Sequence, residues 1–404
     1  MDPVVVGVFL VVYAGMVLGE LPGLALDRTG IALLGAIALI ATGRVPIDAA
    51  WQAIDVSTMA LLLGLMVVSA QFRLGGFYTA VTRRLGSGGH TPAGLLALVI
   101  LTAGVLSAIL ANDIVCLAMA PVLVEICARR ALSPVPFLLA LACAANVGSA
   151  ATLIGNPQNM LIGQALDLSF TRYLVEGGVP AAVGLAVVWG VIALAWRRRW
   201  AGGLAVPDIH APRFDPWQTG KALAVTGALM AAFLFTDWPR EVVALAAAGV
   251  FMVSRRMASR EMLGLVDWHL LVLFAGLFVV NAAVAQSGLL GGLFMALRNA
   301  GLNPSDPAAL FGIAAALSNL VSNVPAVMLL LPAARHELAG PVLALSSTLA
   351  GNLLIVGSIA NIIVIEQARA LGVEIDWKTH ARVGVPVTLA TLALAAAWLV
   401  VIGR

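Results

Sequence analysis

The hexapeptide SAILAN at residues 107–112 returns as SNLVSN at 318–323, and each copy is followed nine residues later by a proline. At a nearly equal offset, Asp55 before one long apolar segment matches Asp267 before another. The pattern G-x-x-x-N at 155–159 recurs at 357–361, at an offset nine residues shorter, which implies a short deletion. The polar residues carry this match, so the chain contains an internal repeat that sets its fold.

The composition places this repeat in a membrane. The chain has 404 residues, of which 61% are hydrophobic and 11% are charged, whereas soluble domains have about 25% charged residues. Several segments are nearly free of charge and, with their flanks, can each form a spanning helix. The sequence therefore predicts an all-α integral membrane protein. The segments are 4–18, 31–41, 59–70, 181–196, 222–235, 242–253, 270–285 and 385–401.

Basic residues predict how the two copies are oriented. We count one short segment in each half as a hairpin that enters and leaves the membrane on the same side. On this assumption, 17 Lys and Arg face one side of the membrane and 6 face the other. Short cytoplasmic loops are rich in these residues, so the larger group is expected inside. Each half then has five crossings, and an odd number makes the copies inverted. We expect a first repeat at 1–196, a cytoplasmic linker at 197–218 and a second repeat at 219–404.

Each half also contains segments that are too short or too broken for ordinary spanning helices. The apolar stretches 114–127 and 308–321 have 14 residues, or about 21 Å of helix, where a crossing needs about 20 residues. They predict re-entrant hairpins at about 92–128 and 308–334. Broken helices are expected to follow at about 135–164 and 342–365, interrupted by Pro157 and nearby glycines. Interrupted backbone is tolerated at this depth where it lines a cavity, so the four breaks should converge on one polar site.

The residues at these breaks are mostly amides and hydroxyls, which donate and accept hydrogen bonds. Helix capping or bonding between helices is the alternative role for each asparagine taken alone. Asp113 is the acid placed at a break, and an ionisable residue inside a membrane is a candidate for function, here proton coupling. It could instead cap the helix that follows. The candidate binding residues are Asn112, Asn156, Gln158, Asn159, Ser322, Asn323, Ser358 and Asn361.

These motifs resemble the ion transporter superfamily over essentially the whole chain. LAND at 110–113 with the Ala-Pro at 120–121, GNPQN at 155–159 and GSIAN at 357–361 look most like the arsenite and antimonite efflux permeases and related anion permeases. The sodium-coupled dicarboxylate branch carries Ser-Asn-Thr at each hairpin tip, and the tips here read AND at 111–113 and SNV at 322–324. The sodium/proton antiporter branch stays open.

The resemblance implies proton-coupled efflux of arsenite and antimonite across the bacterial inner membrane. Arsenite is a small neutral trihydroxide, which suits amides and hydroxyls, and no arginine is expected near the midplane to bind an anion. A permease for an inorganic or organic anion, or a sodium/proton antiporter, is the alternative. An intramembrane protease would need a Ser/His or paired-Asp arrangement within helices, which the sequence lacks, so an enzyme is not expected.

Energy source and partners follow from what the sequence contains. It has no GxxxxGK[ST] motif, so transport would use an ion gradient or a separate soluble ATPase. Three cysteines and five scattered histidines match no metal-site spacing, so no metal or cofactor is predicted. The expected partners are the small substrate, protons and the lipid bilayer, and no nucleic acid.

Overall fold

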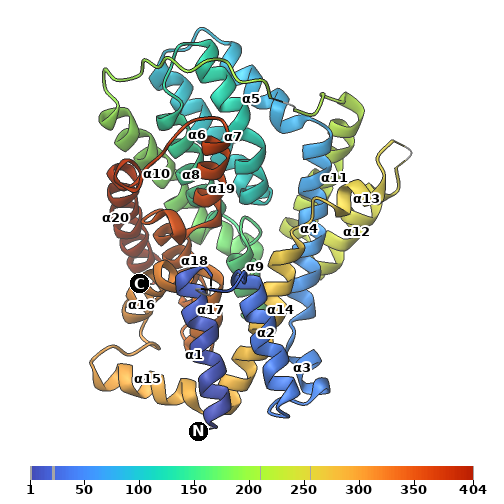
Figure 1. Cartoon of the computed structure of the whole chain (residues 1–404), viewed down its shortest axis with the longest axis vertical. Helices are drawn as coiled ribbons and strands as arrows, with labels where there is room; N and C mark the ends of the chain where they lie inside the picture. Colours follow the sequence, from blue (N-terminus) through green and yellow to red (C-terminus); the bar gives the residue numbers. More distant parts are fainter. Residues whose placement is uncertain (1, 21–22, 210, 255, 404) are drawn as a thin grey trace.

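The computed structural model describes residues 2–20, 23–209, 211–254 and 256–403, and every regular element in these ranges is a helix (Figure 1). The first repeat consists of α1 (Pro3–Leu18), α2 (Arg28–Ala41), α3 (Ile47–Ala53), α4 (Val56–Leu74), α5 (Phe77–Ser87), α6 (Pro92–Ile109), α7 (Asn112–Arg129), α8 (Val135–Ser149), α9 (Pro157–Ala165) and α10 (Phe170–Ala195).

The second repeat has the same elements in the same order. It consists of α11 (Pro216–Phe235), α12 (Arg240–Met252), α13 (Ser259–Leu263), α14 (Trp268–Gln286), α15 (Leu289–Asn299), α16 (Pro307–Val321), α17 (Asn323–Leu330) with η1 (Leu331–Ala333), α18 (Ala339–Ala350), η2 (Ile355–Gly357), α19 (Ile359–Ala370) and α20 (Trp377–Ile402). The fold is therefore the predicted pair of inverted repeats, each with five crossings, a re-entrant hairpin and a broken helix.

The repeated aspartates are helix caps. Asp55 accepts a hydrogen bond from the Thr58 N–H at the start of α4, and Asp267 accepts one from the Leu270 N–H at the start of α14, both at 2.9 Å. A side-chain oxygen at this position satisfies one of the free N–H groups of the first turn. The match between the two residues thus marks where equivalent helices begin.

The repeats pack through two equivalent helix pairs, α4 with α12 and α14 with α2. A Cβ on Gly64 would lie 2.7 Å from the Ala244 carbonyl carbon, and a Cβ on Gly276 would lie 2.7 Å from that of Ala32. The same glycine and alanine positions thus meet twice with the repeats exchanged. In a membrane, small residues of this kind let helix backbones approach closely.

The arm of the first hairpin is longer than expected. We expected a 14-residue helix at 114–127, and α7 has 18 residues and runs from Asn112 to Arg129. Two polar residues form its first turn, and Arg129 pairs with Glu125 at 3.0 Å in its last turn, so the helix continues beyond its apolar stretch. α6 and α7 are joined by Leu110 and Ala111.

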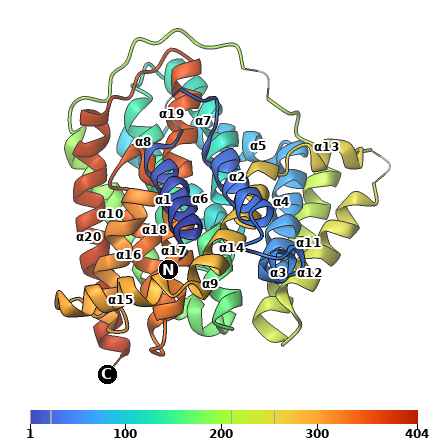
Figure 2. The same cartoon turned by 60° about the horizontal axis from the view of Figure 1, so that its bottom comes forward.

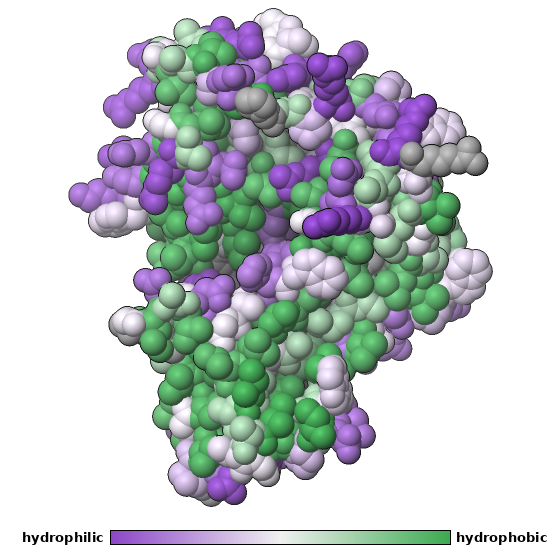
Figure 3. Space-filling model, turned by 45° about the vertical axis from the view of Figure 1, so that its right-hand side comes forward, coloured by the Kyte–Doolittle hydropathy of each residue, from purple (hydrophilic) through white to green (hydrophobic). Residues whose placement is uncertain are grey.

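The surface fits a multi-pass membrane protein. In the part of the chain that the structure describes, six helices are long and apolar enough to cross a membrane, namely α4, α6, α10, α11, α14 and α20. Figure 3 shows hydrophobic side chains over much of one face, with hydrophilic ones gathered at the end drawn at the top. Large apolar side chains such as Leu194 and Phe235 are mostly exposed, which suits contact with lipid.

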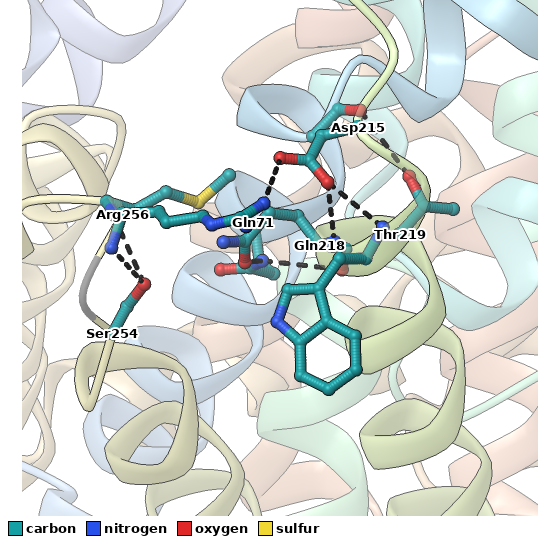
Figure 4. Close-up of polar contacts among 9 residues, drawn as sticks. Gln71, Asp215, Gln218, Thr219, Ser254 and Arg256 are labelled. Atoms are coloured by element: carbon teal, nitrogen blue, oxygen red, sulfur yellow. Dashed lines mark hydrogen bonds and ion pairs between the residues drawn. The ribbon is translucent and has the colours of Figure 1, made fainter.

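The linker between the repeats crosses the same end of the molecule (Figure 2). It ends earlier than expected, because Asp215 accepts hydrogen bonds from the Trp217 and Gln218 N–H groups and so starts α11 at Pro216. In Figure 4 the buried Gln71 of α4 donates to the Gln218 side chain at 2.9 Å, and Arg256 pairs with Asp215. These contacts hold the end of α4 against α11.

Candidate functional site

Both broken helices are stabilised in the same way. Asn159 donates through Nδ2 to the carbonyl oxygens of Ser149 (3.4 Å) and Thr152 (3.0 Å). In the second repeat, Asn361 donates through Nδ2 to those of Gly351 (2.9 Å) and Leu354 (3.1 Å). The acceptors lie ten and seven residues before the asparagine in each case. The amides therefore satisfy the carbonyls that the end of the first helical segment leaves free.

In each broken helix, a side chain caps the start of the second helical segment. Asn156 accepts the Asn159 N–H at 2.9 Å at the start of α9, and Ser358 accepts the Ala360 N–H at 3.2 Å at the start of α19. Both side chains are therefore engaged in holding the break.

Each break is also bonded to the other repeat. Thr348 of α18 bonds Asn156, Gln158 and Asn159, at 3.1 to 3.3 Å. The equivalent residue of α8, 202 positions earlier, is Asn146, which was not among our candidates. It donates to Asn352 (2.9 Å) and Asn361 (3.2 Å) and accepts from Ser358 (2.7 Å). Ser149 connects the two sets, because its hydroxyl accepts from Asn156 and donates to the Asn146 carbonyl oxygen. The two breaks thus share one buried polar network.

A signal for Asn146 and Thr348 was present in the sequence. Both are polar residues inside apolar helices, and they match at the same offset as the two G-x-x-x-N patterns. Polar groups buried in a membrane need partners, so their position before a break indicated a role there.

The hairpin tips have free hydrogen-bonding groups. The Asn112 side chain is 5% exposed, and its Oδ1 has no hydrogen-bond partner among the described residues. Asn323 Oδ1 is likewise buried without a partner in that part of the chain. The two residues open α7 and α17, where N–H groups are also free.

The tips differ in their backbone. Ser322, between α16 and α17, has φ 74° and ψ 161°, a region that is favourable for glycine and strained for other residues. The first tip is instead held by Ser69 of α4, which accepts the Ala111 N–H at 3.1 Å.

The first tip opens into a cavity of about 200 Å³ between α4, α7, α9, α14 and α19. Its polar lining includes Asn112, Asp113 and Asn156 from the predicted set, together with Arg73 and Asp267. The other predicted residues do not line it: Gln158, Asn159, Ser322, Asn323, Ser358 and Asn361 lie outside this cavity. Asn159 and Asn361 are fully buried and hydrogen-bonded at both amide atoms.

Asp113 is not a helix cap. It lies within the first turn of α7, whose N-cap is Ala111, and its carboxylate forms no hydrogen bond or ion pair with the described residues. It faces a cavity that Asp267 also lines. Its carboxylate is therefore open to a ligand or a proton.

Arg73, one of the 17 basic residues expected on the cytoplasmic side, lies in the last turn of α4. Its side chain lines the cavity, and it forms no ion pair with residues that the structure describes. A guanidinium here can bind an anion.

Inverted repeats with re-entrant hairpins and broken helices, and with a cavity at a hairpin tip, define a secondary transporter. The family model described as "CitMHS: Citrate transporter" matches residues 10–341. The chain therefore belongs to this citrate transporter family, within the predicted ion transporter superfamily.

Named relatives span nearly the whole chain. The silicon efflux transporter LSI3 of Oryza sativa is 28% identical, in an alignment that covers 98% of this chain and 96% of that transporter. The "46 kDa membrane protein" of Mycobacterium leprae is 26% identical, covering 99% and 98%, and the putative transporter arsB of Dictyostelium discoideum is 21% identical, covering 94% and 88%. The YdaH transporter of Alcanivorax borkumensis has the same fold, with a TM-score of 0.59, 15% identity and coverage of 99% and 97%.

Proposed function

We propose that this protein is a proton-coupled exporter of arsenite and antimonite in the bacterial inner membrane. The observation that carries the proposal is the cavity at the first hairpin tip, which is lined by Asp113 and by Asn112, whose Oδ1 has no partner among the described residues. The amide offers a donor and an acceptor to a neutral hydroxide, and the carboxylate offers a site for a proton.

Two relatives support a hydroxide substrate. One is named as a silicon efflux transporter and another as a putative arsB. Silicic acid and arsenous acid are both small neutral hydroxides at neutral pH, so similar sites would suit them. Coupling to protons requires no soluble ATPase; a separate ATPase subunit would supply a second energy source.

An anion permease is the second candidate, and Arg73 favours it. A guanidinium in the cavity offers a charged donor that a neutral hydroxide does not require. The family name also refers to citrate. In this case Asp113 would have to be protonated or displaced when the anion binds, because two negative charges would share a cavity of about 200 Å³.

Transport by proteoliposomes separates the candidates. Arsenite, antimonite, phosphate and citrate would be tested with an imposed proton gradient, and sodium-driven exchange would be measured alongside. We expect arsenite and antimonite to accumulate, and Arg73→Gln to leave their KM within about twofold. Citrate or phosphate transport that Arg73→Gln abolishes would instead establish the anion permease, and sodium-dependent exchange without either substrate would establish an antiporter. The matched control is Arg298→Gln, at the exposed end of α15.

A further inference from the structure

Helices α10 and α20 pack against each other, as Figure 1 shows, and each supports the broken helix of its own repeat. Tyr173 of α10 donates through its hydroxyl to the Ala150 carbonyl oxygen at 3.0 Å. His380 of α20 lies 207 positions later, and its Nε2 is 3.1 Å from the Asn352 carbonyl oxygen. Ala150 and Asn352 are equivalent residues, 202 positions apart, and lie just beyond the ends of α8 and α18.

The residues one turn after Tyr173 and His380 are also equivalent, and both are glycines. A Cβ on Gly177 would lie 2.6 Å from the Ala150 oxygen, and a Cβ on Gly384 would lie 2.4 Å from the Asn352 oxygen. Both carbonyls therefore reach their supporting helix only because a glycine leaves room. The two repeats thus use one arrangement, with a tyrosine in one copy and a histidine in the other.

The histidine brings chemistry that the tyrosine lacks. A carbonyl oxygen only accepts hydrogen bonds, so Nε2 carries a proton in this contact. Nδ1 is then free, and it is buried without a hydrogen-bond partner among the described residues. The His380 side chain is 2% exposed. Imidazole is the side chain that ordinarily exchanges a proton between pH 5 and 8, whereas a tyrosine hydroxyl does not.

The neighbouring helices bring no fixed charge to His380. α20 packs on α8, α10 and α18; α18 has no ionisable residue, and α8 has the Cys143 thiol. The ionisable residues of α10 in this contact are Arg172, Tyr173 and Glu176. The Glu176 carbonyl oxygen accepts a hydrogen bond from Trp398 of α20, and Trp398 lies about 27 Å along α20 from His380. On its own chain segment, Glu374, Asp376, Lys378 and Arg382 lie nearby in sequence.

We propose that His380 is a second proton-binding site of this transporter and that proton uptake at Nδ1 stabilises the second broken helix in the arrangement described. This inference rests on the proposed proton coupling. A proton from water converts the neutral ring to imidazolium, and the Nε2–H bond to the Asn352 oxygen becomes charge-assisted and stronger. Burial opposes the charged ring, whereas this bond and the carboxyl end of α18 favour it. The Asn352 side chain in turn accepts from Asn146, which connects the site to the network of both breaks.

Histidine NMR of the full chain in lipid nanodiscs tests the site without transport. The resonance of ring-labelled histidine that disappears in His380→Gln would be followed from about pH 5 to about pH 8. We expect it to titrate within this range. A ring that stays neutral throughout would overturn the proposal, whatever the substrate.

Transport tests the coupling. His380→Tyr reproduces the side chain of the first repeat, and His380→Gln keeps an N–H donor, so we expect both variants to transport arsenite. Their KM for arsenite should depend on pH less steeply than that of the wild type, by one proton, which corresponds to about tenfold per pH unit. His90→Gln, an exposed histidine in the loop before α6, is the control and should match the wild type. Unchanged pH profiles in both His380 variants would overturn the proposal. Asp113→Asn distinguishes this failure from failure of the proposed function, because it removes the primary coupling group and leaves His380 intact.

Discussion

Asn146 Nδ2 lies 2.9 Å from Asn352 Oδ1, a bond that joins the broken helix of the first repeat to that of the second. Thr348 makes the equivalent contacts in the opposite direction, to Asn156 and Asn159. Each break is therefore held by the other repeat. A change at one break must be accommodated at the other, because they share a buried hydrogen-bond network.

The two buried asparagines of the breaks should contribute to stability more than to binding. Asn159→Ala or Asn361→Ala leaves two buried carbonyls without their donor, at a cost of about 1–3 kcal/mol for each unsatisfied group. We expect a clearly lower thermal unfolding temperature in detergent. Gln158→Ala is the control, because the Gln158 side chain makes one hydrogen bond with the described residues, to Thr348 at 3.1 Å, and its loss should cost less. Wild-type stability in both asparagine variants would contradict this role.

The tip asparagines should behave in the opposite way. Asn112 and Asn323 have buried Oδ1 atoms without partners in the described chain, so replacing either with alanine removes no internal bond to that atom. Binding should weaken by about fivefold, since a neutral hydrogen bond contributes about 1 kcal/mol. Arsenite KM and the unfolding temperature would be measured together. If both variants keep wild-type affinity and rate, the tips do not contact the substrate.

Asp113 should carry the proton that drives accumulation. Asp113→Asn keeps the shape of the side chain and removes its titration, and no capping bond is lost because Ala111 is the N-cap. We expect normal expression, loss of uphill arsenite accumulation and loss of its pH dependence, with downhill exchange retained. Counterflow and gradient-driven uptake in the same vesicles measure both. Uphill transport with an unchanged pH profile would place coupling at another residue.

Ser322 offers a test that separates backbone strain from hydroxyl chemistry. Ser322→Gly should raise the unfolding temperature, because φ 74° is strained for serine and relief of such strain is worth about 1–3 kcal/mol. Ser322→Ala keeps the strain and removes the hydroxyl. If the hydroxyl binds substrate, both variants raise the KM for arsenite, whereas only the glycine variant gains stability. A wild-type KM in both would exclude Ser322 from binding.

Much of the fold could be read from the sequence because it depends on local properties. Charge-free stretches set the spanning helices, aspartates such as Asp55 and Asp267 cap them within three residues, and glycines with Pro157 mark the interruption. The repeated spacing of these features indicated the repeat, and the odd number of crossings in each half predicted that the copies are inverted. Helix ends were less predictable: α7 extends over Asn112 and Asp113, because polar residues can occupy a first turn without ending the helix.

The partners of the polar residues were decided only by the tertiary structure. Asn146 and Asn352 are 206 residues apart, and they meet because α18 and α19 of the second repeat pack against α8 of the first. The sequence could not distinguish Asn159, whose amide is fully bonded, from Asn112, whose oxygen is free. Nor could the sequence show that Arg73 lines the same cavity as Asn112 and Asp113. Residue type states what a side chain can bond, but only packing over long distances in the chain determines whether that capacity is already used.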